Sequence, residues 1–105
     1  MKLNIIVHDH SMNLEIPDQF ITSSSDAFDR LDAEMNKGVQ SGQQWLTNPD
    51  RHQRCQIAAG KLLIALETDN QGLAMISAGY IVSRMPEIKR VTIDTYGEPN
   101  GTEFE

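Results

Sequence analysis

The sequence has only one cysteine and no long hydrophobic run. A single cysteine among 105 residues excludes an intramolecular disulfide framework. No apolar stretch approaches the ~20 residues of a membrane-spanning helix. The N-terminus also lacks the charged start, apolar centre and small-residue cleavage site of a secretory signal. We therefore expect a soluble protein of the cytoplasm that makes no use of a membrane.

Basic residues are also scarce. Nine Lys and Arg face 15 Asp and Glu, which gives a formal net charge of -6. Proteins that bind nucleic acid or anionic membranes take much of their affinity from a basic face. The one compact basic cluster, Arg51 to Arg54, is too short to reverse this balance. We expect no nucleic-acid partner.

The motifs that fix a chemistry are missing as well. The glycines are scattered, and none follows a strand into a helix as a phosphate-binding loop requires. Paired acids such as Asp29 with Asp32 lie at spacings typical of a solvated helix surface. Nucleotide binding and catalysis by paired carboxylates therefore have no support in the sequence.

Most of the apolar residues lie between Asn48 and Asp94. Asn48 as N-cap and Pro49 at the first helical position predict the start of a helix of about five turns. Its apolar face recurs at steps of three and four residues, so we expect the cysteine on that face to be a core residue. The face is Cys55, Ala58, Ala59, Leu62, Leu63 and Leu66.

A break and a second helix follow. The residues from Thr68 to Gly72 individually favour caps and turns. The next stretch, Leu73 to Met85, is apolar nearly all round, which predicts a helix that is buried on more than one side. It contains the small residues Ala74, Ala78 and Gly79, and Pro86 ends it.

Three stretches have the pattern of strands. Lys2 to His8 and the alternating stretch from Met12 to Ile16 predict an antiparallel hairpin. Arg90 to Thr95 alternates in the same way, and we expect it to lie beside the first strand. Between them, a helix should begin near Ser23 to Asp26 and extend to about Trp45. Gly38 and Gly42 weaken its second half, and the alternative is a kink or an end between Gly38 and Ser41, with the segment through Trp45 packed differently. The expected face of the helix is Phe28, Leu31, Met35, Val39, Gly42 and Trp45 or Leu46.

These elements predict a single α+β domain over residues 1–105. We expect a three-stranded sheet, made by the N-terminal hairpin and the C-terminal strand, with three helices packed on one face. Residues 97–105 mix Gly, Pro, Asn and acids and should form a loosely ordered acidic tail.

Two histidines give the most suggestive local motif. His8 and His10 would point the same way on one strand and could both reach one divalent metal ion. A zinc site needs about three or four ligands, and the others would have to come from distant residues. A second pair, His52 and Cys55, has the spacing of a base and a thiol on one helix, but it places the thiol on the core face.

The leading functional hypothesis is a non-enzymatic accessory or protein-interaction domain. Regulation is one role that such a domain could have. The alternatives are a metal-binding protein or metal-dependent enzyme that uses His8 and His10, and a small-molecule binder with Trp45 and Tyr80 in a cavity. We expect no other cofactor. We also predict a homodimer, because the second helix has more apolar surface than one small layer covers. The interface residues would be Leu73, Ile76, Tyr80 and Ile81.

Overall fold

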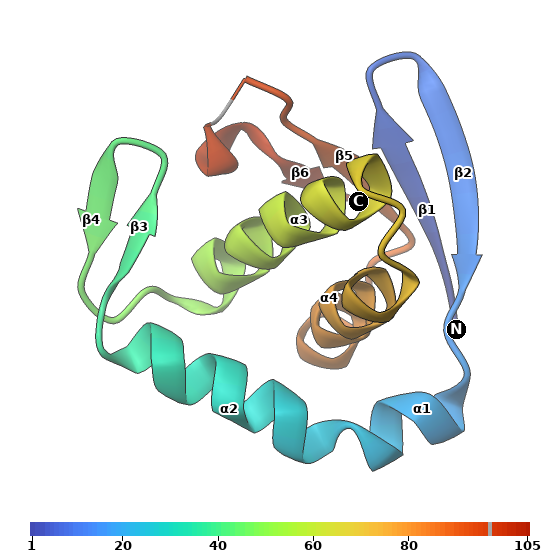
Figure 1. Cartoon of the computed structure of the whole chain (residues 1–105), viewed down its shortest axis with the longest axis horizontal. Helices are drawn as coiled ribbons and strands as arrows, with labels where there is room; N and C mark the ends of the chain where they lie inside the picture. The colour runs from blue at the N-terminus through green and yellow to red at the C-terminus, as the bar shows by residue number, and fades with distance from the viewer. Residues whose placement is uncertain (97) are drawn as a thin grey trace.

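The computed structural model describes residues 1–96 and 98–105 of the chain (Figure 1). The strands are β1 (Lys2–Val7), β2 (His10–Glu15), β3 (Val39–Ser41), β4 (Gln44–Leu46), β5 (Arg90–Ile93) and β6 (Glu103–Phe104). The helices are α1 (Asp18–Ser23), α2 (Ser25–Asn36), α3 (Arg51–Glu67), α4 (Gln71–Arg84) and the short 3-10 helix η1 (Pro99–Gly101).

The fold is α+β, as predicted, but the sheet differs from the predicted one. A mixed four-stranded sheet has the order β2-β1-β5-β6, and β3 and β4 form a separate two-stranded sheet. β1 pairs with β2 as a hairpin, and it pairs in parallel with β5, so that Ile5 lies opposite Val91. The prediction that the C-terminal strand lies beside the first strand is therefore confirmed.

The central strands bury one face, and the opposite face has mostly polar side chains. Leu3, Ile5 and Val91 are fully buried, because alternate side chains of a strand point to the same face. On the opposite face the guanidinium Nε of Arg90 donates to Asn4 Oδ1 over 3.0 Å. This alternation fixes the register of the sheet, since a shift of one residue would expose the whole apolar set.

In place of the loosely ordered tail that we expected, residues 98–105 form η1 and β6. The backbone N–H groups of Lys89 and Arg90 donate to the carbonyl of Glu105 over 2.7 and 3.1 Å. The buried side chain of Gln56 in α3 donates to the Thr102 carbonyl over 3.1 Å. Backbone pairing with an existing strand needs no apolar side-chain pattern, and the composition of the segment therefore did not reveal it. Gly97 lies outside the described residues.

The break between α3 and α4 is confirmed. Asp69 has φ 55°, and the side chain of Asn70 caps α4 by accepting the N–H of Leu73 over 3.1 Å. The start of α3 is two residues later than predicted. Asp50, not Asn48, is the N-cap, because Asp50 and Gln53 each accept the other's backbone N–H in a capping box.

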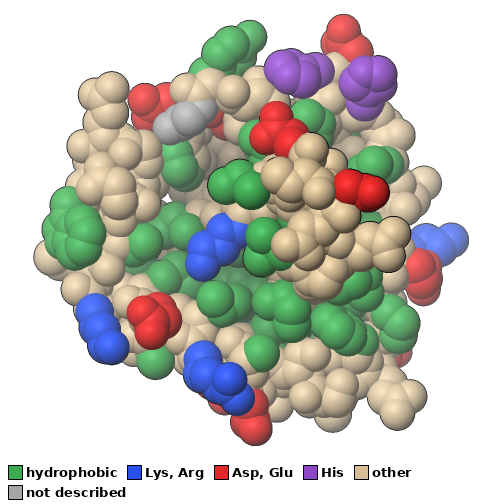
Figure 2. All heavy atoms as spheres, in the orientation of Figure 1, with side chains coloured by type: hydrophobic (Ala, Val, Ile, Leu, Met, Phe, Trp, Pro, Cys, Tyr) green, Lys and Arg blue, Asp and Glu red, His purple; other side chains and the backbone are tan. Residues whose placement is uncertain are grey.

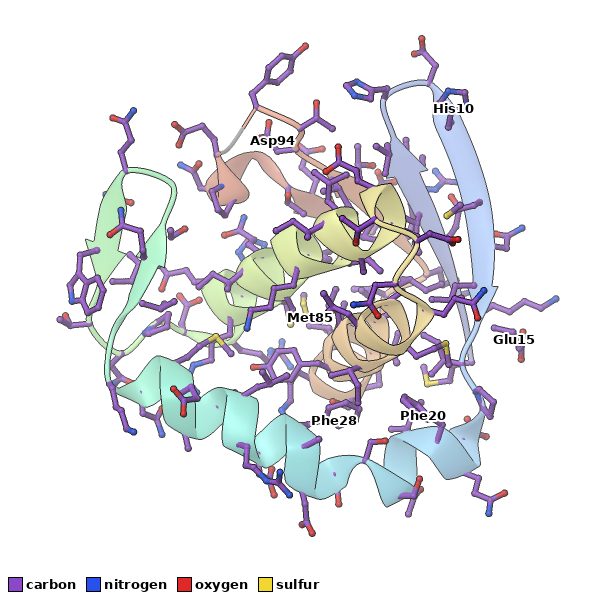
Figure 3. All side chains as sticks on the ribbon, viewed as in Figure 1. His10, Glu15, Phe20, Phe28, Met85 and Asp94 are labelled. Carbon is purple, nitrogen blue, oxygen red and sulfur yellow. The ribbon has the colours of Figure 1, made fainter. Side chains whose placement is uncertain are left out.

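α4 is the most enclosed helix, and residues of the chain itself cover it. A Cβ added to Gly79 would lie 2.9 Å from Phe28 Cζ and 3.2 Å from Phe20 Cε1. Both rings point toward α4 from α2 and α1 (Figure 3). The sequence did not predict α1 (Asp18–Ser23). This helix contributes the apolar cover that the predicted fold lacked.

The helix predicted to extend to Trp45 is confirmed only in its first half. α2 ends at Asn36, and residues 38–47 form a β3–β4 hairpin that we call the arm. Its turn is Gly42-Gln43, and Gly42 has φ 61°, as the first central residue of a type II′ turn requires. The arm stands beside α3 at one edge of the molecule (Figure 1). No helix in residues 1–96 or 98–105 is long and apolar enough to span a bilayer.

Candidate functional site

The two histidines of the metal hypothesis do not share a strand. His8 lies in the β1–β2 turn with φ 55°, whereas His10 is the first residue of β2, near the outer end of the hairpin (Figure 3). Within the described ranges, no group of three or more His, Cys, Asp and Glu side chains is placed to hold a metal ion. Metal binding by His8 and His10 therefore stays a prediction, and the described residues do not add a third ligand to this pair.

The other predicted pairs are also separated or buried. Cys55 is fully buried, and burial raises the pKa of its thiol to about 12, so it is a core residue as the apolar face predicts. The His52 ring instead packs edge-on against Phe104 at 5.5 Å between centroids. Trp45 lies on the arm with 60% of its surface exposed, whereas Tyr80 is 1% exposed inside the fold.

The predicted interface residues lie on α4, but they are not all accessible. Leu73 and Ile76 are half-buried, while Tyr80 and Ile81 are 1% and 0% exposed. Substitution of Tyr80 or Ile81 would therefore perturb the core of the chain. Leu73 and Ile76 keep part of their apolar surface exposed, and the homodimer interface on α4 stays a prediction for these two residues.

A polar network joins α2, α3 and α4 at Asp32. The Asp32 carboxylate accepts Arg54 Nη1 over 3.1 Å, Arg84 Nη2 over 2.8 Å and the Tyr80 hydroxyl. We call these four residues the Asp32 network. Asp32 keeps 26% of its side chain exposed and Arg54 only 14%. The sequence had placed Asp32 on a solvated helix surface, and that interpretation is wrong.

The charges of the Asp32 network are matched within the chain. Burial alone would raise the pKa of Asp32, but the hydrogen bonds from Tyr80, Arg84 and Arg54 outweigh it and lower that pKa below 3.8. Burial, with the bond to Asp32, raises the pKa of Tyr80. The network lines a cleft of about 290 Å³, yet its donors already bind protein acceptors. Its chemistry is that of a structural link between helices.

A groove with the opposite character runs along the outer side of α3. It has a volume of about 390 Å³, a floor of Ile57, Gly60, Leu63 and Ile64, and walls that include Gln40 of the arm and Thr102. Ile64 is 55% exposed, and a Cβ added to Gly60 would meet no atom within 4 Å. We call this site the α3 groove.

The apolar surface continues past the α3 groove. Leu63 also lines a second hollow of about 160 Å³, between α3 and the β1–β2 hairpin, together with Met12 and Leu66. Hydrophobic side chains lie across the middle of this face of the molecule, over α3 and α4, and charged side chains lie mostly around them (Figure 2). Contiguous apolar surface of this kind marks association sites on soluble proteins.

Neither the Asp32 network nor the α3 groove was found from the sequence. The groove positions on α3 have no uniform apolar pattern, because they include Gly60 and Lys61 between Ile57 and Ile64. A helix as long as α3 can also bury some of its positions and expose others. Ile57 and Ile64, outside the apolar face assigned to this helix, were the only signal. Comparison with known proteins finds no matching family, no matching curated protein and no matching solved structure.

Proposed function

We propose that this chain is a non-enzymatic interaction domain, and that it receives an uncharged, apolar protein segment in the α3 groove. The observation that carries the proposal is the open apolar floor at Gly60 and Ile64, where a helix side faces solvent with no part of the described chain over it. Burying such a surface is favourable by about 25 cal/mol per Å² of apolar area.

The groups with shifted pKa values support an interaction role over catalysis. Catalytic acids, bases and nucleophiles combine a perturbed pKa with access to substrate. Here the Cys55 thiol is buried, the Tyr80 hydroxyl donates to Asp32, and Asp32 also accepts from Arg54 and Arg84. These groups serve the fold, whereas the α3 groove offers a surface that the fold itself does not use.

Site-directed photo-crosslinking tests the proposal. A benzophenone amino acid at position 64 should form an adduct with a discrete polypeptide in a lysate of the native cells. The same group at position 96, where Tyr96 is 86% exposed, is the matched control and should not. The adduct should disappear when Gly60→Gln fills the groove. No adduct at position 64, or the same adducts at both positions, would overturn the proposal.

A further inference from the structure

Trp45 is an exposed aromatic side chain that is held in a fixed place. A Cβ on Gly38 would lie 2.6 Å from Trp45 Cζ2 and 2.9 Å from Nε1, so the indole lies directly on the Gly38 backbone. Gly38 has φ 96°, a conformation that favours glycine. A ring ordered in advance loses little conformational entropy on binding, and tryptophan is enriched among the residues that dominate interface energies.

Trp45 and the α3 groove open on the same side of the arm. Gln40 of β3 lies directly opposite Trp45 of β4, and directly opposed residues share one face of a two-stranded ribbon. Gln40 also lines the α3 groove. The arm therefore carries an apolar projection, Trp45, and borders an apolar hollow through Gln40.

The arm brings no charge of its own to the groove edge. Residues 38–49 contain no charged side chain, although the whole chain has a net charge of -6. The groove edge has the carboxylates of Asp94 and Glu98 beside Lys61. An uncharged segment meets this edge without like-charge repulsion, and the indole N–H is a donor for a carboxylate oxygen.

We infer that the occupant of the α3 groove is a second copy of this chain, with Trp45 of each copy seated in the groove of the other. A projection and a hollow on one face are self-complementary, and a twofold axis fills both hollows at once. A volume of about 390 Å³ falls within the range of pockets that bury small organic groups. This inference rests on the proposed function and moves the predicted homodimer interface from α4 to α3 and the arm.

The first test measures mass and Trp45 fluorescence together, since Trp45 is the only tryptophan. Over about 1 µM to 1 mM, where weak dimers dissociate, the mass should rise from 11.8 kDa toward twice that value. The indole emission should shift to shorter wavelength with the same concentration dependence. Trp45→Ala and Gly60→Gln should stay monomeric, and Tyr96→Ala should dimerise as the unmodified protein does.

Mixing the two monomeric variants gives a sharper test. Gly60→Gln keeps Trp45, and Trp45→Ala keeps the open groove, so a mixed pair restores one of the two contacts. Titrating Trp45→Ala into Gly60→Gln should shift the indole emission to shorter wavelength, a result that unfolding of either variant cannot produce. The control is the double variant Trp45→Ala/Ile64→Glu. When it is titrated into Gly60→Gln, the indole emission should stay unchanged.

Three results would overturn this inference. They are a monomeric mass at every concentration, a dimer that persists in Trp45→Ala or Gly60→Gln, and a mixture whose emission does not shift. A monomer that still crosslinks from position 64 to a different polypeptide would remove the second copy as occupant and leave the proposed function standing.

Discussion

The Asp32 network and the α3 groove each use a part of α3, and the two parts of the helix orient their side chains in opposite ways. Near the start of α3, Arg54 turns a charged group inward and bonds it to Asp32, Asn36 and Asn48. Near its end, Ile64 turns an apolar group outward with 55% of its surface exposed. Inward polar groups with partners hold the fold together, whereas outward apolar groups without cover are available for association.

The largest loss of stability is expected from a substitution of Asp32. Asp32→Ala removes the acceptor of Arg54, Tyr80 and Arg84 and leaves partly buried donors without it, so we expect the free energy of unfolding to fall by about 2–3 kcal/mol. Urea denaturation measures this. Asp29→Ala is the control, since Asp29 is 74% exposed and forms an ion pair with Arg84, and it should cost under about 1 kcal/mol. Equal losses in both variants would contradict the assigned role.

Acid should weaken the same link. Against the effect of burial, the hydrogen bonds from Tyr80, Arg84 and Arg54 hold the pKa of Asp32 in the folded protein below its ordinary value, which is about 3.9 in an unfolded chain. The folded state therefore binds this proton less readily, and the stabilisation is present above about pH 4 and lost as pH falls through the folded pKa. The difference in unfolding free energy between the unmodified protein and Asp32→Asn should shrink below pH 4. A difference that stays constant down to pH 2.5 would count against the network.

Two glycines sharpen the contrast between covered and open surface. Gly60→Ala should raise the unfolding free energy by up to about 1 kcal/mol, because it adds helix propensity where a Cβ meets no atom within 4 Å. Gly79→Ala should lower it, because the added Cβ would lie 2.9 Å from Phe28. Thermal melts of both variants measure the two signs. Destabilisation by Gly60→Ala would mean that the groove is covered.

The smallest effect is expected at Ile64. Ile64→Ser should change the unfolding free energy by no more than about 0.5 kcal/mol, the usual range for an exposed position. Ile57→Ala, at a position with 9% exposure on the same helix, should cost about 2 kcal/mol or more. Chemical denaturation of the pair measures the difference. A loss at Ile64 as large as at Ile57 would show that Ile64 belongs to the core.

The elements that were predicted are those whose signals are local. Alternation marks the β1–β2 hairpin and β5, and cap residues mark the break before α4. Local spacing also misled. Val39, Gly42 and Trp45 fall at three-residue steps by coincidence, while the glycine at the start of the Gly42-Gln43 turn, between two short β-forming stretches, was the better signal for a hairpin.

The site could not be read in this way because its contacts are distant in sequence. Asp32 meets Arg54, Tyr80 and Arg84 across 22, 48 and 52 positions. On its own helix it has the spacing of a surface acid. The α3 groove likewise depends on the arm and on Thr102 as walls, and the sequence had placed the arm in a helix and Thr102 in a loose tail.

The parallel pairing of β1 with β5 also sets the order in which the chain can fold. Ile5 and Val91 are neighbours in the sheet, yet the ribosome makes Val91 roughly 4–17 s after Ile5 at ~5–20 residues per second. During that interval the apolar face of the β1–β2 hairpin has no β5 beside it. By contrast, α3 and α4 pack against each other and are joined by a short turn. Folding should therefore begin with the α3–α4 pair and end with the sheet. A chaperone that binds nascent chains would find its exposed target at Leu3 and Ile5.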